Sequence, residues 1–229
     1  AFDMSDWLTL KSGYDGFDLP AYHCKPLDAR RGGLVVIQEI FGVNPHIRSI
    51  AEGFAADGYE TLAPAFFERA KPGFEADYTP MGFGRGRDLV GKTPWDQVIA
   101  DLQAAIDALA PPVFVVGYCW GGSAAWLAAC RCEGLAASSG YYGRQVLDFK
   151  DETPRVPVIL HYGKTDHSTP PENYEAVIAA QPDLPVYLYD AGHGFNCDQR
   201  EDYAPDAARL ARLRTLQLFQ RNSGVKAEA

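Results

Sequence analysis

The stretch VFVVGYCWGGSAAWLAA, residues 113–129, decides the fold of this chain. Its first four residues are apolar and typical of a buried strand, and its last seven are mostly small, as in a tightly packed helix. The glycines between them allow a sharp bend. Cys119 stands at that bend, which is the layout of a nucleophile elbow with cysteine in the usual place of serine. The free N–H groups and positive dipole end of the following helix favour a thiolate and a developing oxyanion.

Length and charge limit the classes of protein to consider. The chain has 229 residues, which fits a single domain over 1–229. A formal net charge of -9 argues against nucleic acid or an anionic membrane as a partner. It still permits a small anionic substrate, because a few local arginines can outweigh the global field. Residues 223–229, SGVKAEA, are expected to form a frayed tail.

Cysteine use and hydropathy point to the cytoplasm. The five cysteines match no disulfide framework or zinc ribbon, because their number is odd and their spacing irregular. No apolar run approaches the roughly 18 residues of a membrane span, and no segment has a signal-peptide layout. We therefore expect a reduced cytoplasmic protein, acting as a monomer, with no membrane partner. No motif requires a metal or a cofactor.

Short apolar runs recur along the chain between helical patterns. Continuous apolar strands that alternate with helices predict a doubly wound, mostly parallel α/β sheet with helices on both faces. Two N-terminal runs, 7–10 and 17–23, are expected to pair as an antiparallel hairpin at the sheet edge. The expected inner strands are 34–38, 59–63, 113–116, 136–141, 156–162 and 186–189.

Helices are expected over 46–56, 172–180 and 206–220, and another from Pro94 onward, capped by Thr93. Residues 66–92 contain many glycines and prolines and are too long for a plain connection. They predict a lid or substrate-binding loop. Glycines at 82, 84 and 86 do not indicate a phosphate loop, because no strand precedes them.

Two later loops complete a candidate active site. Asp166 follows the strand at 156–162, and His193 follows the strand at 186–189. The chain order Cys119, Asp166, His193 is that of α/β-hydrolases. All three residues follow predicted parallel strands, at whose carboxyl ends ligands bind. Each one alone is more typical of a filler, a turn or a cap, so the joint pattern carries the prediction.

Four other residues compete for chemical roles. His161 lies within a strand and is interpreted as core or pocket wall. His167 adjoins Asp166 in sequence, so their side chains diverge. Cys130 and Cys132 resemble a redox or metal pair, but they fall late in a helical pattern and are interpreted as buried small residues.

Five motifs together resemble those of the dienelactone hydrolase family, the cysteine branch of the α/β-hydrolase fold. They match in order and spacing over nearly the whole chain. The motifs are QEIFG at 38–42, GYCWGG at 117–122, GYYG at 140–143, GKTDH at 163–167 and AGHGF at 191–195.

The resemblance implies a mechanism. Cys119 would attack an ester or lactone carbonyl and form a thioester, with His193 moving the proton and Asp166 orienting His193. Glu39 would contact the resting cysteine and help to deprotonate it when substrate binds; the alternative is that Glu39 merely caps its loop. The backbone N–H groups of Trp120 and Ile40 would bind the oxyanion.

The resemblance is weaker at the residues that would bind the substrate. The family holds a substrate carboxylate with arginines and tyrosines, and the position of one such arginine is occupied here by Cys197, three residues before Arg200. Arg85 is the nearest match for the other arginine, with Arg69 and Arg87 as alternatives. We expect Tyr142, Phe41 and Phe195, with Arg85, to contact the substrate. That substrate need not be dienelactone itself, and neutral esters should be accepted.

Two functions of other classes stay open at this point. One is a ligand-binding module whose triad is unused, and the other is a thiol redox sensor that pairs Cys119 with Cys130 or Cys132. The elbow together with all three triad residue types favours hydrolysis, since neither alternative needs His193 and Asp166.

Overall fold

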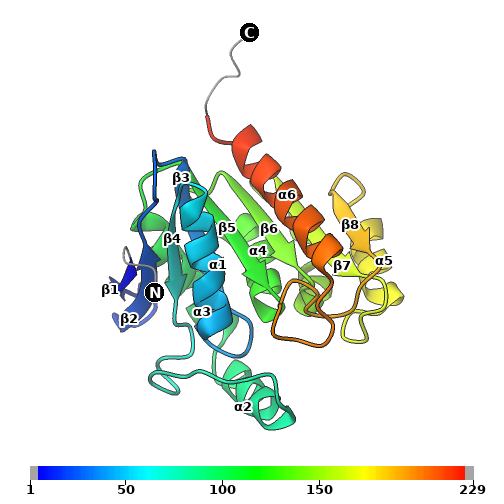
Figure 1. The fold of residues 1–229 in the computed structure, drawn as a ribbon, viewed down its shortest axis with the longest axis horizontal. Coiled ribbons are helices and arrows are strands. Elements are labelled where there is room, and N and C mark those ends of the chain that lie inside the picture. The colour runs from blue at the N-terminus through cyan, green and yellow to red at the C-terminus, as the bar shows by residue number, and fades with distance from the viewer. Residues whose placement is uncertain (1–4, 225–229) are drawn as a thin grey trace.

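A single mixed sheet forms the centre of the computed structural model, which describes residues 5–224 (Figure 1). The strand order is β1-β2-β4-β3-β5-β6-β7-β8. The pairs β1–β2 and β2–β4 are antiparallel and the other neighbours are parallel. The strands are β1 (Ser5–Lys11), β2 (Asp18–Cys24), β3 (Gly32–Ile37), β4 (Tyr59–Pro64), β5 (Val113–Tyr118), β6 (Ala137–Tyr141), β7 (Val158–Gly163) and β8 (Val186–Tyr189).

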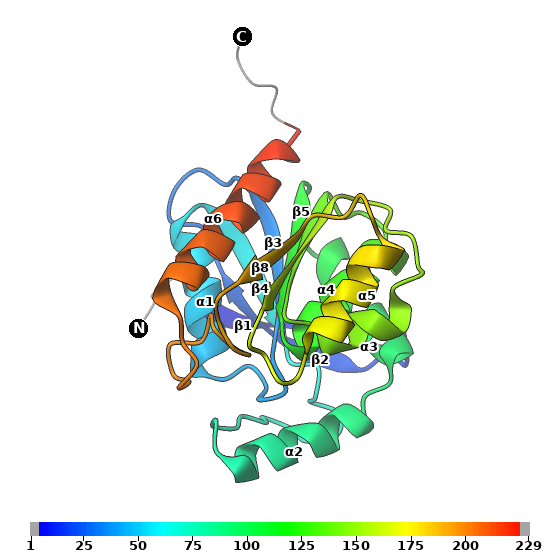
Figure 2. The ribbon, with the colours of Figure 1, turned by 90° about the vertical axis from the view of Figure 1, so that its right-hand side faces the viewer.

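Helices cover both faces of this sheet, as Figure 2 shows. Helices α1 and α6 lie on one face, and α3, α4 and α5 lie on the other. The helices are α1 (Pro45–Ala56), α2 (Pro80–Gly91), α3 (Trp95–Asp107), α4 (Trp120–Arg131), α5 (Pro171–Ala180) and α6 (Pro205–Arg221), with a 3-10 helix at Arg144–Phe149. The predicted doubly wound α/β sheet with an antiparallel N-terminal hairpin is thereby confirmed.

Alternation along the inner strands explains the two layers. In β3, Leu34 and Val36 join the core formed with α1 and α6, whereas Val35 and Ile37 join the core formed with α3 and α4. Successive side chains of a strand point to opposite faces, so a strand covered on both sides must be apolar throughout. All six residues of β3 are buried.

The segment 66–92 differs from its predicted loop, because its second half is helix α2. Thr79 caps this helix by accepting a hydrogen bond from the Gly82 amide (3.1 Å), and Pro80 occupies the first turn. Gly86 is needed for packing rather than flexibility: a Cβ there would lie 2.4 Å from the Ile40 carbonyl oxygen. Figures 1 and 2 both show α2 apart from the sheet, at one end of the molecule.

The predicted cap at Thr93 is wrong. Helix α3 begins at Trp95, and Pro94 is its N-cap without a side-chain bond. The Thr93 hydroxyl instead donates to the Leu89 carbonyl (2.8 Å), so it closes the end of α2. Within the expected tail, residues 225–229 lie outside the described part of the chain. Among residues 5–224, no helix is long and apolar enough to cross a membrane.

Candidate active site

Cys119 lies at the turn between β5 and α4 in a strained conformation. Its φ of 60° and ψ of -121° are rare for a residue with a Cβ. Its amide donates to the Tyr141 carbonyl (2.9 Å), and its own carbonyl accepts from the Gly122 amide (2.8 Å). The turn is therefore held from both sides, and the thiol stays partly exposed.

The glycines of the elbow are required by close backbone contacts. A Cβ at Gly117 would lie 1.8 Å from the Gly121 carbonyl oxygen, and one at Gly121 would lie 2.4 Å from that of Gln38. Gly122 is as crowded, at 2.2 Å from the Tyr141 carbonyl oxygen. The start of α4 thus packs directly on the backbone of two neighbouring segments, and this fixes the position of Cys119.

Loops after β5, β7 and β8 bring the three predicted residues together. Nε2 of His193 lies 3.0 Å from Sγ of Cys119, and Nδ1 of His193 lies 2.6 Å from Oδ2 of Asp166. Asp166 and His193 are both buried. The sulfur, the imidazole and the carboxylate therefore form one continuous hydrogen-bonded chain that ends at a partly exposed atom.

Asp166 is held by its own loop. The Ser168 amide donates to its Oδ1 (2.7 Å) and the Thr169 hydroxyl donates to its Oδ2 (2.8 Å). Burial alone would raise the pKa of Asp166, but the hydrogen bond and charge of His193 and the Thr169 hydroxyl outweigh it, so the pKa is lowered. The carboxylate stays ionised in the buried site.

His193 shows the opposite shift. Burial alone would lower its pKa, but the charge of the Cys119 thiolate and the hydrogen bonds to Asp166 and Cys119 outweigh it, so the pKa is raised above its ordinary value. The raised pKa favours the protonated, imidazolium form of His193. A base that can hold and release a proton between two such partners suits general acid–base chemistry.

Glu39 is fully buried behind this set, in the loop after β3. Its Oε1 accepts a hydrogen bond from the Tyr78 hydroxyl (2.7 Å), and Nη1 of Arg200 lies 3.7 Å from its Oε2. Burial and the neighbouring Glu39 charge raise the pKa of Tyr78, so that hydroxyl remains a donor. In this structure the sulfur of Cys119 is hydrogen-bonded to His193, and the Glu39 carboxylate is hydrogen-bonded to Tyr78.

Aromatic residues surround the imidazole. The Tyr142 ring lies 5.0 Å from the His193 ring and 5.2 Å from the Phe195 ring, measured between centroids. Tyr142 has a φ of 36°, and its amide donates to the His161 carbonyl (2.7 Å). Phe41 lies on the Glu39 side, with its ring centroid 4.6 Å from that of Tyr78. The three predicted aromatic residues are therefore split between the His193 and Glu39 sides.

The two predicted oxyanion donors belong to segments that flank Cys119. Trp120 is the first residue of α4, so its amide has no helical carbonyl to bond. Ile40 follows Glu39 directly, and the close packing of Gly86 on its carbonyl fixes that loop. Trp120 is further held by stacking on Trp95, at 5.6 Å between ring centroids.

The candidate arginines are placed very differently. Arg69 binds the carboxylates of Asp15 and Asp101, as part of a structural ion-pair network. Arg85 and Arg87 are exposed and pack over the rings of Phe74 and Phe83, respectively. Only Arg200, among the four candidates, contacts Glu39.

The competing histidines and cysteines lie where a structural, non-catalytic role predicts. His161 is fully buried between Ser139 and Tyr189, and burial lowers its pKa to about 3. His167 is exposed. Cys130 and Cys132 are buried at the far end of α4, and burial raises their pKa values to about 12.

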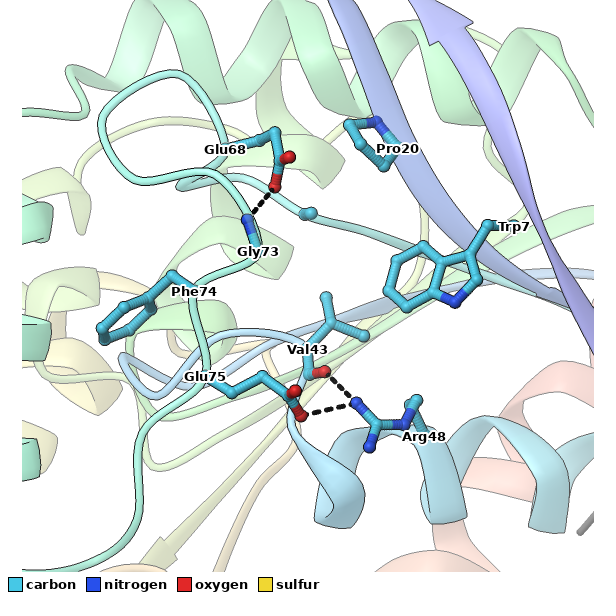
Figure 3. Close-up of a pocket in the computed structure, with 9 residues that line it drawn as sticks. Trp7, Pro20, Val43, Arg48, Glu68, Gly73, Phe74 and Glu75 are labelled. Atoms are coloured by element: carbon cyan, nitrogen blue, oxygen red, sulfur yellow. Dashed lines mark hydrogen bonds and ion pairs between the residues drawn. The ribbon is translucent and has the colours of Figure 1, made fainter.

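Tyr78 and His46 are site neighbours that the sequence did not single out. Tyr78 lies in an irregular segment, and His46 lies in the first turn of α1, about 150 residues from Cys197. Only the fold brings them to Glu39. A pocket on another part of the surface, lined by Trp7, Arg48 and Glu75 among others, includes none of the residues around Cys119 (Figure 3).

An eight-stranded α/β sheet with a strained cysteine elbow, followed along the chain by an aspartate and a histidine that reach it, defines the α/β-hydrolase class. Comparison with known proteins gives the branch. The sequence profile described as "Dienelactone hydrolase family" matches residues 19–223, and the chain belongs to that family.

Individual relatives agree with this assignment. The chain is 35% identical over 236 residues to a "Putative carboxymethylenebutenolidase" of Salmonella typhimurium, with 92% of this chain and 86% of that protein covered. It is 32% identical to the "Carboxymethylenebutenolidase" of a Pseudomonas species, with 85% and 87% covered. The crystal structure titled "Putative Dienelactone Hydrolase", from Klebsiella pneumoniae, has a TM-score of 0.83 and 31% identity, with 95% and 98% covered. The chain is an enzyme of the ester- and lactone-hydrolase type.

Proposed function

We propose that this protein hydrolyses a carboxylic ester or lactone through a thioester formed on Cys119. The observation that carries the proposal is the continuous chain from Sγ of Cys119 through His193 to Asp166, with distances of 3.0 and 2.6 Å. These contacts lie within the range expected for a nucleophile, its base and the group that orients the base.

The reaction runs in two halves. His193 holds the proton of the Cys119 thiol while the sulfur attacks the carbonyl carbon, and it then gives that proton to the leaving alkoxide oxygen. In a lactone this oxygen remains part of the acyl chain. A water molecule then attacks the thioester and passes a proton to His193, which returns it to the departing sulfur and so restores the enzyme.

Trp120 and Ile40 supply the proposed oxyanion hole. Their backbone N–H groups would donate to the carbonyl oxygen as it becomes negative, next to the positive end of α4. Losing one such donor costs about 3 kcal/mol of barrier in comparable sites.

Glu39 is proposed to exchange between two partners. Bonded to Tyr78, it leaves Cys119 to His193, which is the arrangement suited to attack. Turned to Cys119, it would hold the thiol in a resting state; when substrate binds, it would help to pass the thiol proton to His193 and would itself turn to Tyr78. A thiol protected in this way is less exposed to oxidation than a permanent thiolate.

Substrate contacts are proposed for Tyr142, Phe41 and Phe195, with 66–92 as a lid. Arg200 is the arginine beside Glu39 and suits a substrate carboxylate, whereas the role of Arg85 stays a prediction. A single anchor should make the enzyme less dependent on a carboxylate than enzymes with two. Rates on a panel of neutral esters and on dienelactone test this, and a strong preference for dienelactone would refute it.

The competing functions are separated by chemistry at Cys119. An ester that labels Cys119 stoichiometrically and is then released supports hydrolysis, whereas the absence of any adduct supports a binding module. A disulfide with Cys130 or Cys132 would support redox sensing, but both lie at the opposite end of α4 from Cys119, roughly 16 Å or more along its axis. We expect the reaction to need no cofactor. The single-domain organisation, the monomeric state and the cytoplasmic location stay predictions.

A further inference from the structure

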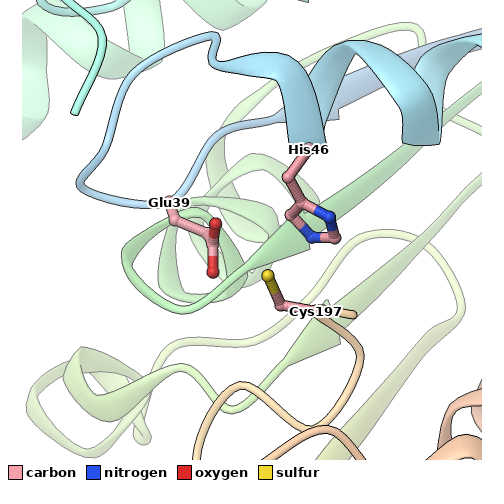
Figure 4. A group of neighbouring side chains, drawn as sticks. All are labelled: Glu39, His46 and Cys197. Atoms are coloured by element: carbon pink, nitrogen blue, oxygen red, sulfur yellow. The ribbon is translucent and has the colours of Figure 1, made fainter. Parts of the chain in front are cut away.

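We propose that Glu39, His46 and Cys197 form a binding site for a thiophilic divalent cation, with Zn²⁺ as the ion that fits best. One ligand atom from each residue lies within 4.8 Å of the others (Figure 4). The residues come from the loop after β3, the first turn of α1 and the loop after β8. The fold therefore assembles the site from three separate segments.

The donor set suits zinc by its chemistry. One imidazole nitrogen, one sulfur and one carboxylate oxygen are typical zinc ligands, at about 2.0–2.3 Å from the metal. Tetrahedral coordination then requires ligand atoms roughly 3.5 Å apart. The ligand atoms of this site are at most 4.8 Å apart, so small side-chain rotations would bring them to that spacing. The fourth coordination position would be left for water.

Unpaired buried atoms are the second, independent observation. His46 is 3% exposed, and Glu39 and Cys197 are fully buried. Within residues 5–224, Oε2 of Glu39 and both ring nitrogens of His46 have no hydrogen-bond partner. Buried polar atoms are normally paired, so several unpaired ones that converge on one point indicate a ligand.

Neighbouring groups orient the proposed ligands. Tyr78 occupies Oε1 of Glu39, so Oε2, which has no hydrogen bond and faces Arg200 at 3.7 Å, is the oxygen offered to the metal. Asp198 lies 3.8 Å from Nδ1 of His46, which favours a proton on Nδ1 and leaves Nε2 as the ligand. Asn44 fixes the start of α1 by accepting from the Ile47 amide (3.1 Å).

The charges around the site both favour and oppose a cation. Burial lowers the pKa of His46, so the ring is neutral as a ligand must be. Burial raises the pKa of Cys197 to about 11, so the metal must displace the thiol proton to solvent. Zn²⁺ with one thiolate and one carboxylate is then neutral overall. Arg200 opposes binding and would give up its contact with Glu39.

Bound metal would also inhibit the enzyme, an inference that rests on the proposed function. A Glu39 held by Zn²⁺ could not exchange between Tyr78 and Cys119. Metal binding at this position would therefore slow hydrolysis without touching the sulfur of Cys119 or the His193 ring.

Cobalt titration tests the site directly. Co²⁺ added to metal-free Cys119→Ala protein should give a thiolate-to-cobalt absorption band that saturates at one equivalent. The Cys119→Ala background removes the one partly exposed thiol of the described residues, and it keeps the test independent of hydrolysis. Adding Cys197→Ser should abolish the band. Adding His46→Gln should weaken cobalt binding by more than about 100-fold, which is more than the loss of a residue that only hydrogen-bonds to a metal ligand would cause. Cys132→Ser is the matched control, a buried thiol elsewhere that should leave the band unchanged.

Three results would overturn the site: no band at one equivalent, a band that survives Cys197→Ser, or a wild-type band that Cys119→Ala removes. The last would place the ion on Cys119 and His193. If Cys197→Ser fails to fold by circular dichroism, His46→Gln decides. Zn²⁺ should slow ester hydrolysis by the wild type and not by Cys197→Ser. If the wild type hydrolyses no ester, the proposed function fails while the cobalt result still judges the metal site.

Discussion

The two sides of the candidate site differ in how their polar atoms are paired. On the Cys119 side, Asp166 and His193 use their oxygens and nitrogens in short hydrogen bonds. On the Glu39 side, unpaired buried atoms remain on Glu39, His46 and Arg200 within the described residues. On the first side the Asp166 and His193 atoms are paired, and among the described residues only the buried hydroxyl of Tyr142, beside His193, lacks a hydrogen-bond partner. The second has the unfilled hydrogen-bonding capacity of a surface that receives a ligand or changes partner.

The largest effect should come from the Cys119 side. Cys119→Ala removes the proposed nucleophile and should lower kcat/KM for an ester by about 10⁴-fold or more, with the unfolding midpoint nearly unchanged. Steady-state kinetics and thermal melts check this. Cys132→Ser serves as the control and should retain full activity. Substantial esterase activity in folded Cys119→Ala protein would remove the proposed mechanism.

Asp166→Asn should come next. The amide cannot hold the His193 tautomer or support an imidazolium, so kcat should fall on the order of 10³-fold. Asp190→Asn, at an exposed residue of the neighbouring loop, is the matched control and should change kcat less than twofold. Equal effects of the two substitutions would show that Asp166 has no orienting role.

A third prediction concerns Glu39. Tyr78→Phe removes the hydrogen bond to Glu39, worth about 1 kcal/mol, together with the one that the hydroxyl accepts from the Asn44 side chain. It should lower kcat by about fivefold, because Glu39 can find other partners. Comparison of kcat for this variant with that of Asp166→Asn sharpens the contrast between the two sides. A loss as large as that of Asp166→Asn would show the Glu39 side to be equally rigid.

The glycines offer a paired test of stability. Gly121→Ala places a Cβ against the Gln38 carbonyl and should lower the free energy of unfolding by about 3 kcal/mol. Gly84→Ala, on the open side of α2, meets nothing within 4 Å and should raise it by about 0.5–1 kcal/mol. Denaturant melts measure both. The proposed close packing of α4 would be wrong if Gly121→Ala were as harmless as Gly84→Ala.

The smallest effect is the pH dependence of stability. The lowered pKa of Asp166 stabilises the folded state above its ordinary value of 3.8, and this contribution disappears as the pH falls through the lowered folded-state value. Wild-type protein should therefore exceed Asp166→Asn in stability at pH 7, and the difference should shrink in acid. Unfolding measured from pH 7 to pH 3 tests the sign. A difference that grows in acid would contradict the paired carboxylate.

The Cys119 side could be predicted from the sequence because its signals are local. The apolar run before Cys119 gives a strand, the glycines give a turn, and Asp166 and His193 each follow another strand. Parallel strands bring such positions together at one edge of the sheet. The predicted sheet, its hairpin and the family are confirmed, whereas the catalytic roles still await the experiments above.

The Glu39 side could not be predicted because no local pattern links its members. Tyr78 and Arg200 have no fixed spacing from Glu39, and His46 looks like an ordinary residue at the start of a helix. Helix α2 was missed because glycine usually breaks helices. Here Gly86 allows close packing on Ile40, and that preference appears only once the partner backbone is in place.

Trapping the acyl-enzyme tests the central claim most directly. The wild-type enzyme is mixed with a chromogenic ester, quenched in acid within the first turnover and measured by intact-protein and peptide mass spectrometry. The proposed mechanism predicts one acyl group on Cys119 that forms with the release of alcohol and disappears as the acid product accumulates. Turnover with no adduct on Cys119, or with the acyl group on another residue, would contradict it.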